Sequence, residues 1–264
     1  MKKVFFPLVL AALVAPSILA AQSPFDGTWK IEMSKVNFPN DADTYDLLNG
    51  TYQCMTCVPP YTINADGSDQ AVTGHPYYDS VAIKVVNENQ IEETCKKDGK
   101  VVITSTTAIS PDGKTLKYEF TDSSNTNGGP PVTGSGEATR LAKGSPGGHA
   151  ISGSWRTTKM ESMSDNATAW TYKVDGKEIT MTNPTGQSYT APLNGKDAPM
   201  KGDPGINGVS VKMKGKSVLE ETDRRDGKVV GVFRMTIAPD GKTAKASYED
   251  MLQHRITEFD ALKQ

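Results

Sequence analysis

The sequence predicts an all-β protein in which two tandem antiparallel up-and-down β-barrels follow a signal peptide. Three observations predict this fold: an internal repeat, tight-turn dipeptides that recur in both halves, and alternation of apolar and polar side chains between those turns. The repeat indicates two copies of one domain, while the turns and the alternation indicate that each copy is built from strands.

The first 21 residues have the organisation of a signal peptide. Lys2 and Lys3 form a basic start, an apolar stretch runs to Leu19, and Ala20 and Ala21 offer a small-residue cleavage site. Two prolines interrupt the apolar stretch, which is also short for a membrane span of about 20 residues. We therefore expect cleavage after Ala21, a periplasmic or secreted location and no stable membrane insertion afterwards; an uncleaved anchor is the alternative.

The internal repeat divides the rest of the chain. Residues 72–122 align without a gap on residues 200–250, and 20 of the 51 paired positions are identical. A repeat of this length exceeds a short solenoid unit, so each copy can bury a core of its own. We expect a first barrel at 22–141, a Gly/Pro/Ser-rich linker at 142–150 and a second barrel at 151–264.

Asp-Gly and Asn-Gly pairs separate the expected strands. Both pairs tolerate the positive φ that tight hairpin turns require. The interval of 14 residues from Asp98 to Asp112 is repeated from Asp226 to Asp240. A strand of about 8 to 10 residues fits between such turns.

Side chains alternate between the turns. Residues 81–85 read Val-Ala-Ile-Lys-Val, so Lys84 faces away from the large apolar side chains, and 116–121 and 209–214 alternate in the same way. This period predicts half-buried antiparallel strands, about seven to nine in each copy, closed into a barrel that removes exposed edges. The best helix candidate is a short segment at residues 41–48.

Each copy begins with a Gly-x-Trp element, which ends at Trp29 in copy one and at Trp155 in copy two. This element, ahead of an up-and-down antiparallel domain, resembles the calycin superfamily of lipocalins and fatty-acid-binding proteins. The resemblance implies that the tryptophan closes one barrel end and that a basic residue of the last strand packs across its ring. Arg140 matches that position for Trp29, and Arg255 is the counterpart for Trp155. The chain is also similar to secreted bacterial proteins of unassigned function with such lipocalin-like domains.

All three cysteines lie in copy one. Cys54 and Cys57 form a CxxC element, for which a structural disulfide is the first interpretation and a redox dithiol or half of a metal site are the alternatives. A zinc site needs two more ligands, and only Cys95 and His75 are candidates. Cys54–Cys57 is the easy local closure, whereas either cysteine joined to Cys95 would link neighbouring strands. We expect no metal and no cofactor.

Two glutamate pairs recur in both copies, beginning at Glu92 and at Glu220. Adjacent residues of a strand face opposite sides, so neither pair can form an acid/base dyad. One glutamate of each pair could point into the barrel; a solvated strand end is the alternative. The chain contains neither a nucleophile elbow nor a phosphate-binding loop, and we assign no catalytic residue.

The candidate ligand-binding residues are aromatic side chains of copy one. They are Tyr77, Tyr78, Tyr118 and Phe120. Copy two has Ala246 where copy one has Tyr118, which favours copy one as the binding half.

The net charge of −2, with basic and acidic residues interleaved, gives no footprint for nucleic acid. The first hypothesis is an exported binding protein that holds a small hydrophobic or amphipathic molecule in the first barrel. The second is a ligand-free envelope module with a protein partner. The third is an enzyme on the same barrel, which would need a titratable cluster such as Glu92 or Glu93 with His75.

Overall fold

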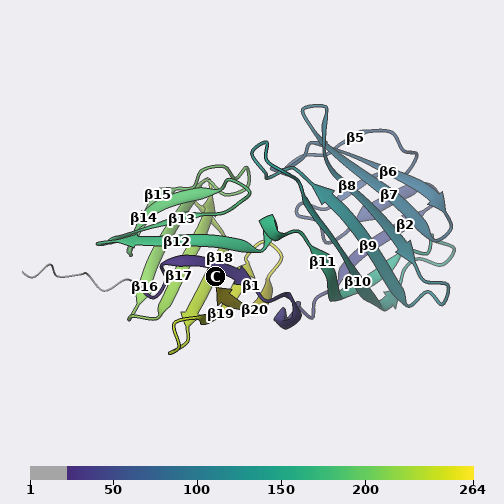
Figure 1. Cartoon of the computed structure of the whole chain (residues 1–264). Coiled ribbons are helices and arrows are strands. Elements are labelled where there is room, and N and C mark those ends of the chain that lie inside the picture. Colours follow the sequence, from purple (N-terminus) through teal and green to yellow (C-terminus); the bar gives the residue numbers. More distant parts are fainter. Residues whose placement is uncertain (1–22) are drawn as a thin grey trace, which may run out of the picture.

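A computed structural model describes residues 23–264 (Figure 1). The predicted signal peptide, residues 1–21, lies outside the described residues. The described chain is all-β apart from two single-turn 3-10 helices, η1 (Met33–Lys35) and η2 (Asp165–Ala167). Its strands form two ten-stranded antiparallel sheets, and each sheet curls into a nearly closed barrel. The predicted fold class and the tandem repeat are therefore confirmed, with one to three more strands in each barrel than the turns indicated.

Barrel one has the strand order β4-β3-β2-β11-β10-β9-β8-β7-β6-β5. Its strands are β2 (Asp43–Leu48), β3 (Thr51–Cys54), β4 (Tyr61–Asn64), β5 (Gln70–Ala71), β6 (Ser80–Asn87), β7 (Gln90–Lys97), β8 (Lys100–Ile109), β9 (Thr115–Asp122), β10 (Val132–Lys143) and β11 (Gly153–Met163).

Barrel two has the order β14-β13-β12-β1-β20-β19-β18-β17-β16-β15. Its strands are β1 (Gly27–Ile31), β12 (Ala169–Asp175), β13 (Glu178–Thr182), β14 (Ser188–Pro192), β15 (Asn194–Pro199), β16 (Gly208–Lys214), β17 (Val218–Arg225), β18 (Lys228–Ile237), β19 (Thr243–Asp250) and β20 (Arg255–Lys263).

The two copies exchange their first strands. Strand β1 belongs to copy one in sequence, but it pairs with β12 and β20 in barrel two. Strand β11 belongs to copy two, but it pairs with β10 and β2 in barrel one. The sheets therefore do not follow the expected division into 22–141 and 151–264.

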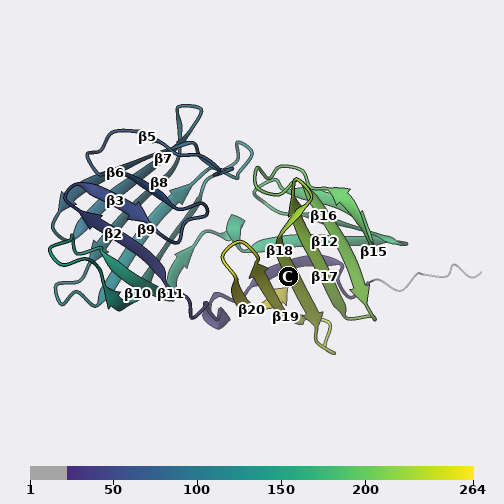
Figure 2. The same ribbon diagram turned by 180° about the vertical axis from the view of Figure 1, so that it is seen from behind.

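The connections between the barrels differ from the expected linker as a result. Residues 142–150 do not join the barrels; they lie within barrel one, at the connection between β10 and β11, whose short length keeps these two strands antiparallel neighbours. The chain instead passes between the barrels twice, through residues 32–42 and residues 164–168. Two views from opposite sides show the barrels side by side, with both passages between them (Figures 1 and 2).

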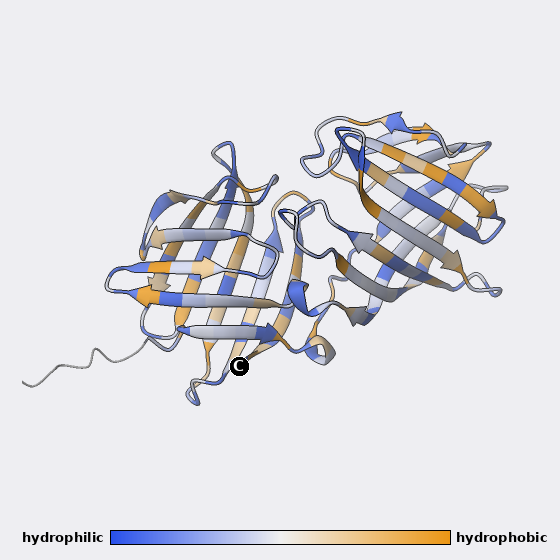
Figure 3. Cartoon of the chain, turned by 45° about the horizontal axis from the view of Figure 1, so that its top comes forward, coloured by the Kyte–Doolittle hydropathy of each residue, from blue (hydrophilic) through white to orange (hydrophobic). Residues whose placement is uncertain are grey.

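Turn chemistry and alternation account for the strands themselves. At the β7–β8 turn, Asp98 and Gly99 have φ of 50° and 74°, and Asp226 and Gly227 have nearly the same values in barrel two. Two successive positive φ values are those of a type I′ hairpin turn, whose twist matches that of the flanking strands. Hydrophobic and hydrophilic residues alternate along the strands of both barrels (Figure 3).

The expected helix at 41–48 is wrong, because residues 43–48 form strand β2. Asn49 and Gly50, with φ of 52° and 77°, make a two-residue turn that pairs β2 with β3. The other edge of β2 pairs with β11. Pairing on both sides overrides a weak local helix preference.

Trp29 and Trp155 close equivalent positions of the two barrels. Their rings are almost completely buried, and each indole N–H donates to the carbonyl oxygen four residues earlier, at 2.9 Å and 2.7 Å. Lys263 Nζ lies 5.1 Å from the Trp29 ring centroid, while the guanidinium of Arg140 lies 3.9 Å from that of Trp155. The expected pairing of Arg140 with Trp29 is therefore wrong, because the strand exchange sets β11 beside β10.

Arg255 also differs from its expected place. It does not cover Trp155; it binds the Asp43 carboxylate and the Ala42 carbonyl oxygen at 2.8 Å each, from barrel two to barrel one. A second polar contact between the barrels centres on Asp203, whose carboxylate accepts from the Tyr77 hydroxyl at 3.0 Å and the Asn125 amide at 2.8 Å. The two barrels are thus joined by side chains as well as by two chain passages.

Candidate functional site

Barrel one encloses a cavity of about 430 Å³. Its wall is mostly apolar and aromatic, with a few polar groups on β7, β8 and β11. The residues that line it are Asp43, Tyr45, Tyr52, Cys54, Cys57, Tyr61, Tyr78, Ile91, Glu93, Cys95, Ile103, Ser105, Thr107, Leu116, Tyr118, Ala138, Ile151, Trp155 and Thr157.

Glu93 is the central polar group of this cavity. It faces inward, whereas Glu92 faces outward and binds Lys84 at 2.9 Å, so the pleat of β7 separates the two carboxylates. The Glu93 carboxylate accepts from the Tyr61 and Ser105 hydroxyls, each at 3.3 Å. Burial raises the pKa of Glu93, and these hydrogen bonds offset part of the shift. A carboxyl group that holds its proton here can both donate and accept a hydrogen bond.

The tyrosine–glutamate pair occurs in both barrels. At the repeat offset of 128, Tyr61 and Glu93 correspond to Tyr189 and Glu221, and the Tyr189 hydroxyl donates to Glu221. Both glutamates that follow Glu92 and Glu220 therefore face inward, rather than standing at a solvated strand end. The next inward position is Cys95 in barrel one and Asp223 in barrel two.

Large side chains fill the corresponding space in barrel two. Phe233 stands at the position of Ser105, and its ring centroid is 5.9 Å from that of Trp170. Phe259 pairs with Ala246, and its ring centroid lies 6.4 Å from that of Trp170. Ala246 therefore makes room for an aromatic ring of the neighbouring strand, and the small Ser105 helps to leave barrel one open.

The structure separates the four predicted ligand-binding residues. Tyr78 and Tyr118 line the cavity. Tyr77 instead points to barrel two, where it donates to Asp203. Phe120 lies beside Tyr118, with ring centroids 6.5 Å apart, and packs over Gly134, where an added Cβ would lie 2.7 Å from the phenyl ring.

His75 stands behind the cavity wall. Its ring stacks on Tyr78 at 4.7 Å and meets the edge of Tyr61 at 5.6 Å, measured between centroids. Its Nε2 atom is buried and has no hydrogen-bond partner among the described residues, and burial lowers the pKa of the imidazole. Tyr61 therefore connects His75 to Glu93.

Two kinds of sulfur line the same cavity. Cys54 and Cys57 form a disulfide with a Cα–Cα distance of 5.5 Å, which confirms the local closure. Cys95 is a free, buried thiol, and burial raises its pKa. Within residues 23–264, no three His, Cys, Asp or Glu side chains gather in a group that could hold a metal ion.

Sequence reasoning missed most of the cavity. Tyr45, Tyr52 and Tyr61 were not among its candidates, although all three line the wall. The signal for Tyr61 is its identity with Tyr189 at the repeat offset, eleven residues before the aligned window begins.

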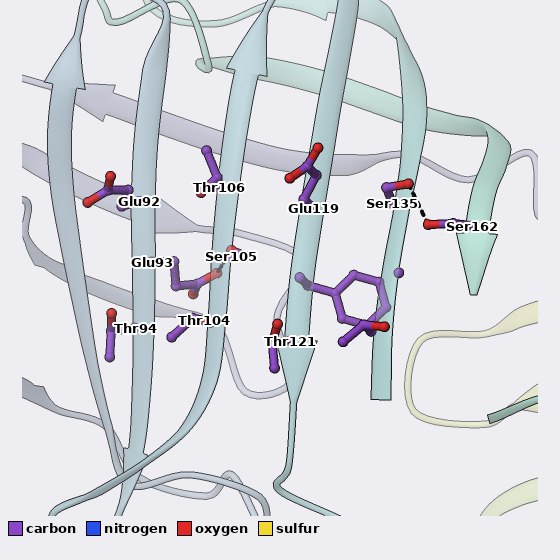
Figure 4. A pocket seen from close by; sticks show the side chains of 13 residues that line it. Glu92, Glu93, Thr94, Thr104, Ser105, Thr106, Glu119, Thr121, Ser135 and Ser162 are labelled. Carbon is purple, nitrogen blue, oxygen red and sulfur yellow. Dashed lines mark hydrogen bonds between the residues drawn. The ribbon is translucent and has the colours of Figure 1, made fainter. Parts of the chain in front are cut away.

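A second hollow, of about 600 Å³, lies on the outer face of barrel one and is called the outer groove here (Figure 4). It crosses β7 to β11 between two rows of outward side chains. Because neighbouring residues of a strand face opposite sides, the residues between the rows contribute their backbone to its floor. One row is Thr94, Thr104, Thr121 and Thr133, and the other is Glu92, Thr106, Glu119, Ser135 and Ser162.

No model of a known protein family matches this chain, and no curated protein matches it significantly. Among the described residues, no helix is long and apolar enough to span a membrane.

Proposed function

We propose that the chain is an exported lipocalin-like binding protein whose barrel one holds a small, partly apolar molecule with at least one hydrogen-bonding group. The observation that carries this proposal is the cavity of about 430 Å³ with Glu93 in its wall. Cavities of about 300 to 1,000 Å³, mostly apolar with a few placed polar groups, are typical of small-molecule sites.

The chemistry of the wall indicates the ligand class. Tyr45, Tyr52 and Tyr118 offer flat apolar surface, while Glu93 and Ser105 provide the polar contacts. A hydroxyl or amine of the ligand would bind the Glu93 carboxyl group, and a carbonyl would accept its proton. The burial that raises the pKa of Glu93 disfavours charge in the cavity, so a neutral ligand group is favoured over a charged one.

The lipocalin-like assignment and export rest on separate observations. In both barrels a Gly-x-Trp tryptophan is buried under a basic residue, Lys263 over Trp29 and Arg140 over Trp155. Residues 1–21 support export, because a basic start is followed by an apolar stretch and then by small residues, as in a signal peptide. The Cys54–Cys57 disulfide also supports export, since it suits an oxidising compartment.

The first test is native mass spectrometry of the mature full chain before and after denaturation. A small molecule that co-purifies and is lost on denaturation supports the proposal and identifies the ligand class. The second test is a titration with N-phenyl-1-naphthylamine, an apolar fluorescent probe with one N–H donor.

Ser105→Phe copies the residue that fills barrel two, so it should abolish probe binding while the protein stays folded. Thr104→Phe also introduces a phenyl ring, but at the preceding residue, whose side chain points outward. This variant should leave probe binding intact. If the native mass equals that of the protein alone and the probe does not bind, the ligand-binding function is rejected. The ligand-free envelope module with a protein partner is then favoured.

A further inference from the structure

Barrel two carries an arginine at the position that Thr106 holds in the outer groove of barrel one. On β18, Arg234 donates through Nε to Glu220 at 3.0 Å and through Nη1 to Glu249 at 3.2 Å. Glu220 and Arg234 are direct cross-strand partners. The outer face of barrel two thus holds a guanidinium between two carboxylates.

Barrel one keeps the first of these carboxylates and lacks the arginine, because Glu92 and Thr106 match Glu220 and Arg234. Its second carboxylate stands at another position: Thr121 matches Glu249, and Glu119 matches Ser247. Glu92 and Thr106 are the cross-strand partners at the position of Glu220 and Arg234. Glu119 pairs with Thr106 from the other side. The two carboxylates therefore flank a short hydroxyl side chain from strands that lie roughly 9.5 Å apart.

The charges around this position leave room for a cation. Glu92 binds one lysine, Lys84, as Glu220 also binds Lys214 in addition to its arginine. Glu119 forms no ion pair with any described residue, whereas Lys117 and Glu137 on the same face pair with each other. A further cation could therefore pair with Glu119, which has no ion-pair partner among the described residues, and with Glu92, which has only Lys84.

We propose that the outer groove binds an arginine side chain from an extended segment of a partner protein. The guanidinium would lie over Thr106 and pair with Glu92, as Arg234 pairs with Glu220 in barrel two. Glu119, the other cross-strand partner of Thr106, would be its second acceptor. Arginine fits better than lysine because its planar fork donates to two acceptors at once. The hydroxyl rows of the groove provide hydrogen bonds for the flanking peptide backbone.

The size of the groove agrees with such an occupant. It crosses five strands, from β7 to β11, and strands are spaced about 4.8 Å apart, so it is roughly 19 Å long. An extended peptide rises about 3.3 Å per residue, so about six residues fit along the groove. This site is distinct from the inner cavity, because the wall of the barrel separates the two.

The test is a calorimetric titration of the mature full chain with a capped hexapeptide of glycine and serine that has one central arginine. The matched control peptide carries citrulline, which keeps the planar shape but has a carbonyl oxygen in place of one nitrogen, so it loses the charge and two of the five N–H donors. We expect one bound arginine peptide, affinity that decreases with added salt, and binding of the citrulline peptide weaker by about tenfold.

Two reciprocal variants make the test specific. Thr106→Arg places an arginine across from Glu92, as Arg234 stands across from Glu220, so the protein's own arginine should occupy the groove and lower peptide affinity by about tenfold or more. Arg234→Thr should expose Glu220 and Glu249 and raise the stoichiometry from one peptide to two.

The proposal is overturned if the arginine peptide fails to bind, if citrulline binds equally well, or if Thr106→Arg leaves the affinity unchanged. Binding of N-phenyl-1-naphthylamine should be the same in Thr106→Arg and in the unaltered protein. This measurement separates a failure of the outer groove from a failure of the inner cavity.

Discussion

The guanidinium of Arg140 lies 3.9 Å from the ring centroid of Trp155, although the two residues belong to different copies of the repeat. Its three nitrogens also donate to the carbonyl oxygens of Gly113, Ser152 and Ala150, each at 2.5 Å. Arg140 therefore fastens the exchanged strand β11 and the turns around it into barrel one.

Loss of Arg140 should be more costly than loss of its counterpart in barrel two. Arg140→Ala removes a cation–π contact and leaves three carbonyl groups without their donor, so we expect a loss of about 3 kcal/mol in the free energy of unfolding. Lys263→Ala removes a longer contact and one hydrogen bond, to Pro24, and should cost about 1 kcal/mol. Urea unfolding measures both, and equal losses would contradict the anchoring role of Arg140.

The strand exchange can be tested by engineered disulfides. Thr28 and Thr171 are cross-strand partners with hydroxyls 2.8 Å apart, so cysteines at both positions should form a disulfide that joins β1 to barrel two. Cysteines at 28 and 44 should stay unlinked, because Thr44 pairs with Ser154 instead. Peptide mapping distinguishes the outcomes, and a 28–44 link would show that β1 remains in barrel one.

The asymmetry between the barrels gives a ligand prediction. Tyr118→Ala removes one aromatic side chain from the cavity wall and should weaken N-phenyl-1-naphthylamine binding by about tenfold. Ala246→Tyr lies opposite Phe259 in barrel two, away from the cavity, and should not change the affinity. Equal effects of the two substitutions on probe fluorescence would refute the assignment of the ligand to barrel one.

The buried carboxyl pair of barrel two predicts how stability depends on pH. Burial raises the pKa of Asp223 to about 6, and burial and the Asp223 charge raise the pKa of Glu221 as well. A carboxyl whose pKa is raised by folding holds its proton more tightly in the folded chain. The free energy of unfolding should therefore decrease as the pH rises from about 4, near the unfolded pKa, through the folded value.

Asp223→Asn removes this charge from the interior. The variant should gain on the order of 2 kcal/mol over the unaltered protein at pH 7.5, and the difference should shrink towards pH 4. Urea unfolding at both pH values checks the sign. A variant whose stability follows the same pH dependence as the unaltered chain would show that Asp223 does not cause it.

The state of the cysteines predicts an alkylation count. In the native protein no thiol should react quickly, because Cys95 is buried and its pKa is raised. Denaturation without reductant should allow one alkylation, and denaturation with reductant should allow three, since Cys54 and Cys57 are paired. Intact mass gives the count, and more than one alkylation without reductant would exclude the disulfide.

Part of the candidate site follows from the sequence. The sequence indicates Tyr78 as an aromatic residue of a turn-like segment and Tyr118 as one of an alternating strand, and both line the cavity. Tyr77, one residue earlier than Tyr78, points to Asp203 in barrel two. Its partner comes from a loop of the other barrel, 126 residues away in sequence, so no local pattern indicates the contact.

The sequence by itself determined most strands, their turns and the presence of two barrels, with β2 the exception because it was expected as a helix. These features depend on local rules: Asp-Gly pairs such as Asp98-Gly99 accept positive φ, and alternation such as that of 81–85 matches a half-buried strand. Only the tertiary structure decided which barrel receives β1 and which receives β11, because both strands begin with the same Gly-x-Trp element, which does not indicate the partner strands. It also decided that barrel one is open and barrel two is filled, because that depends on side chains such as Ser105 and Phe233 that meet across strands distant in sequence.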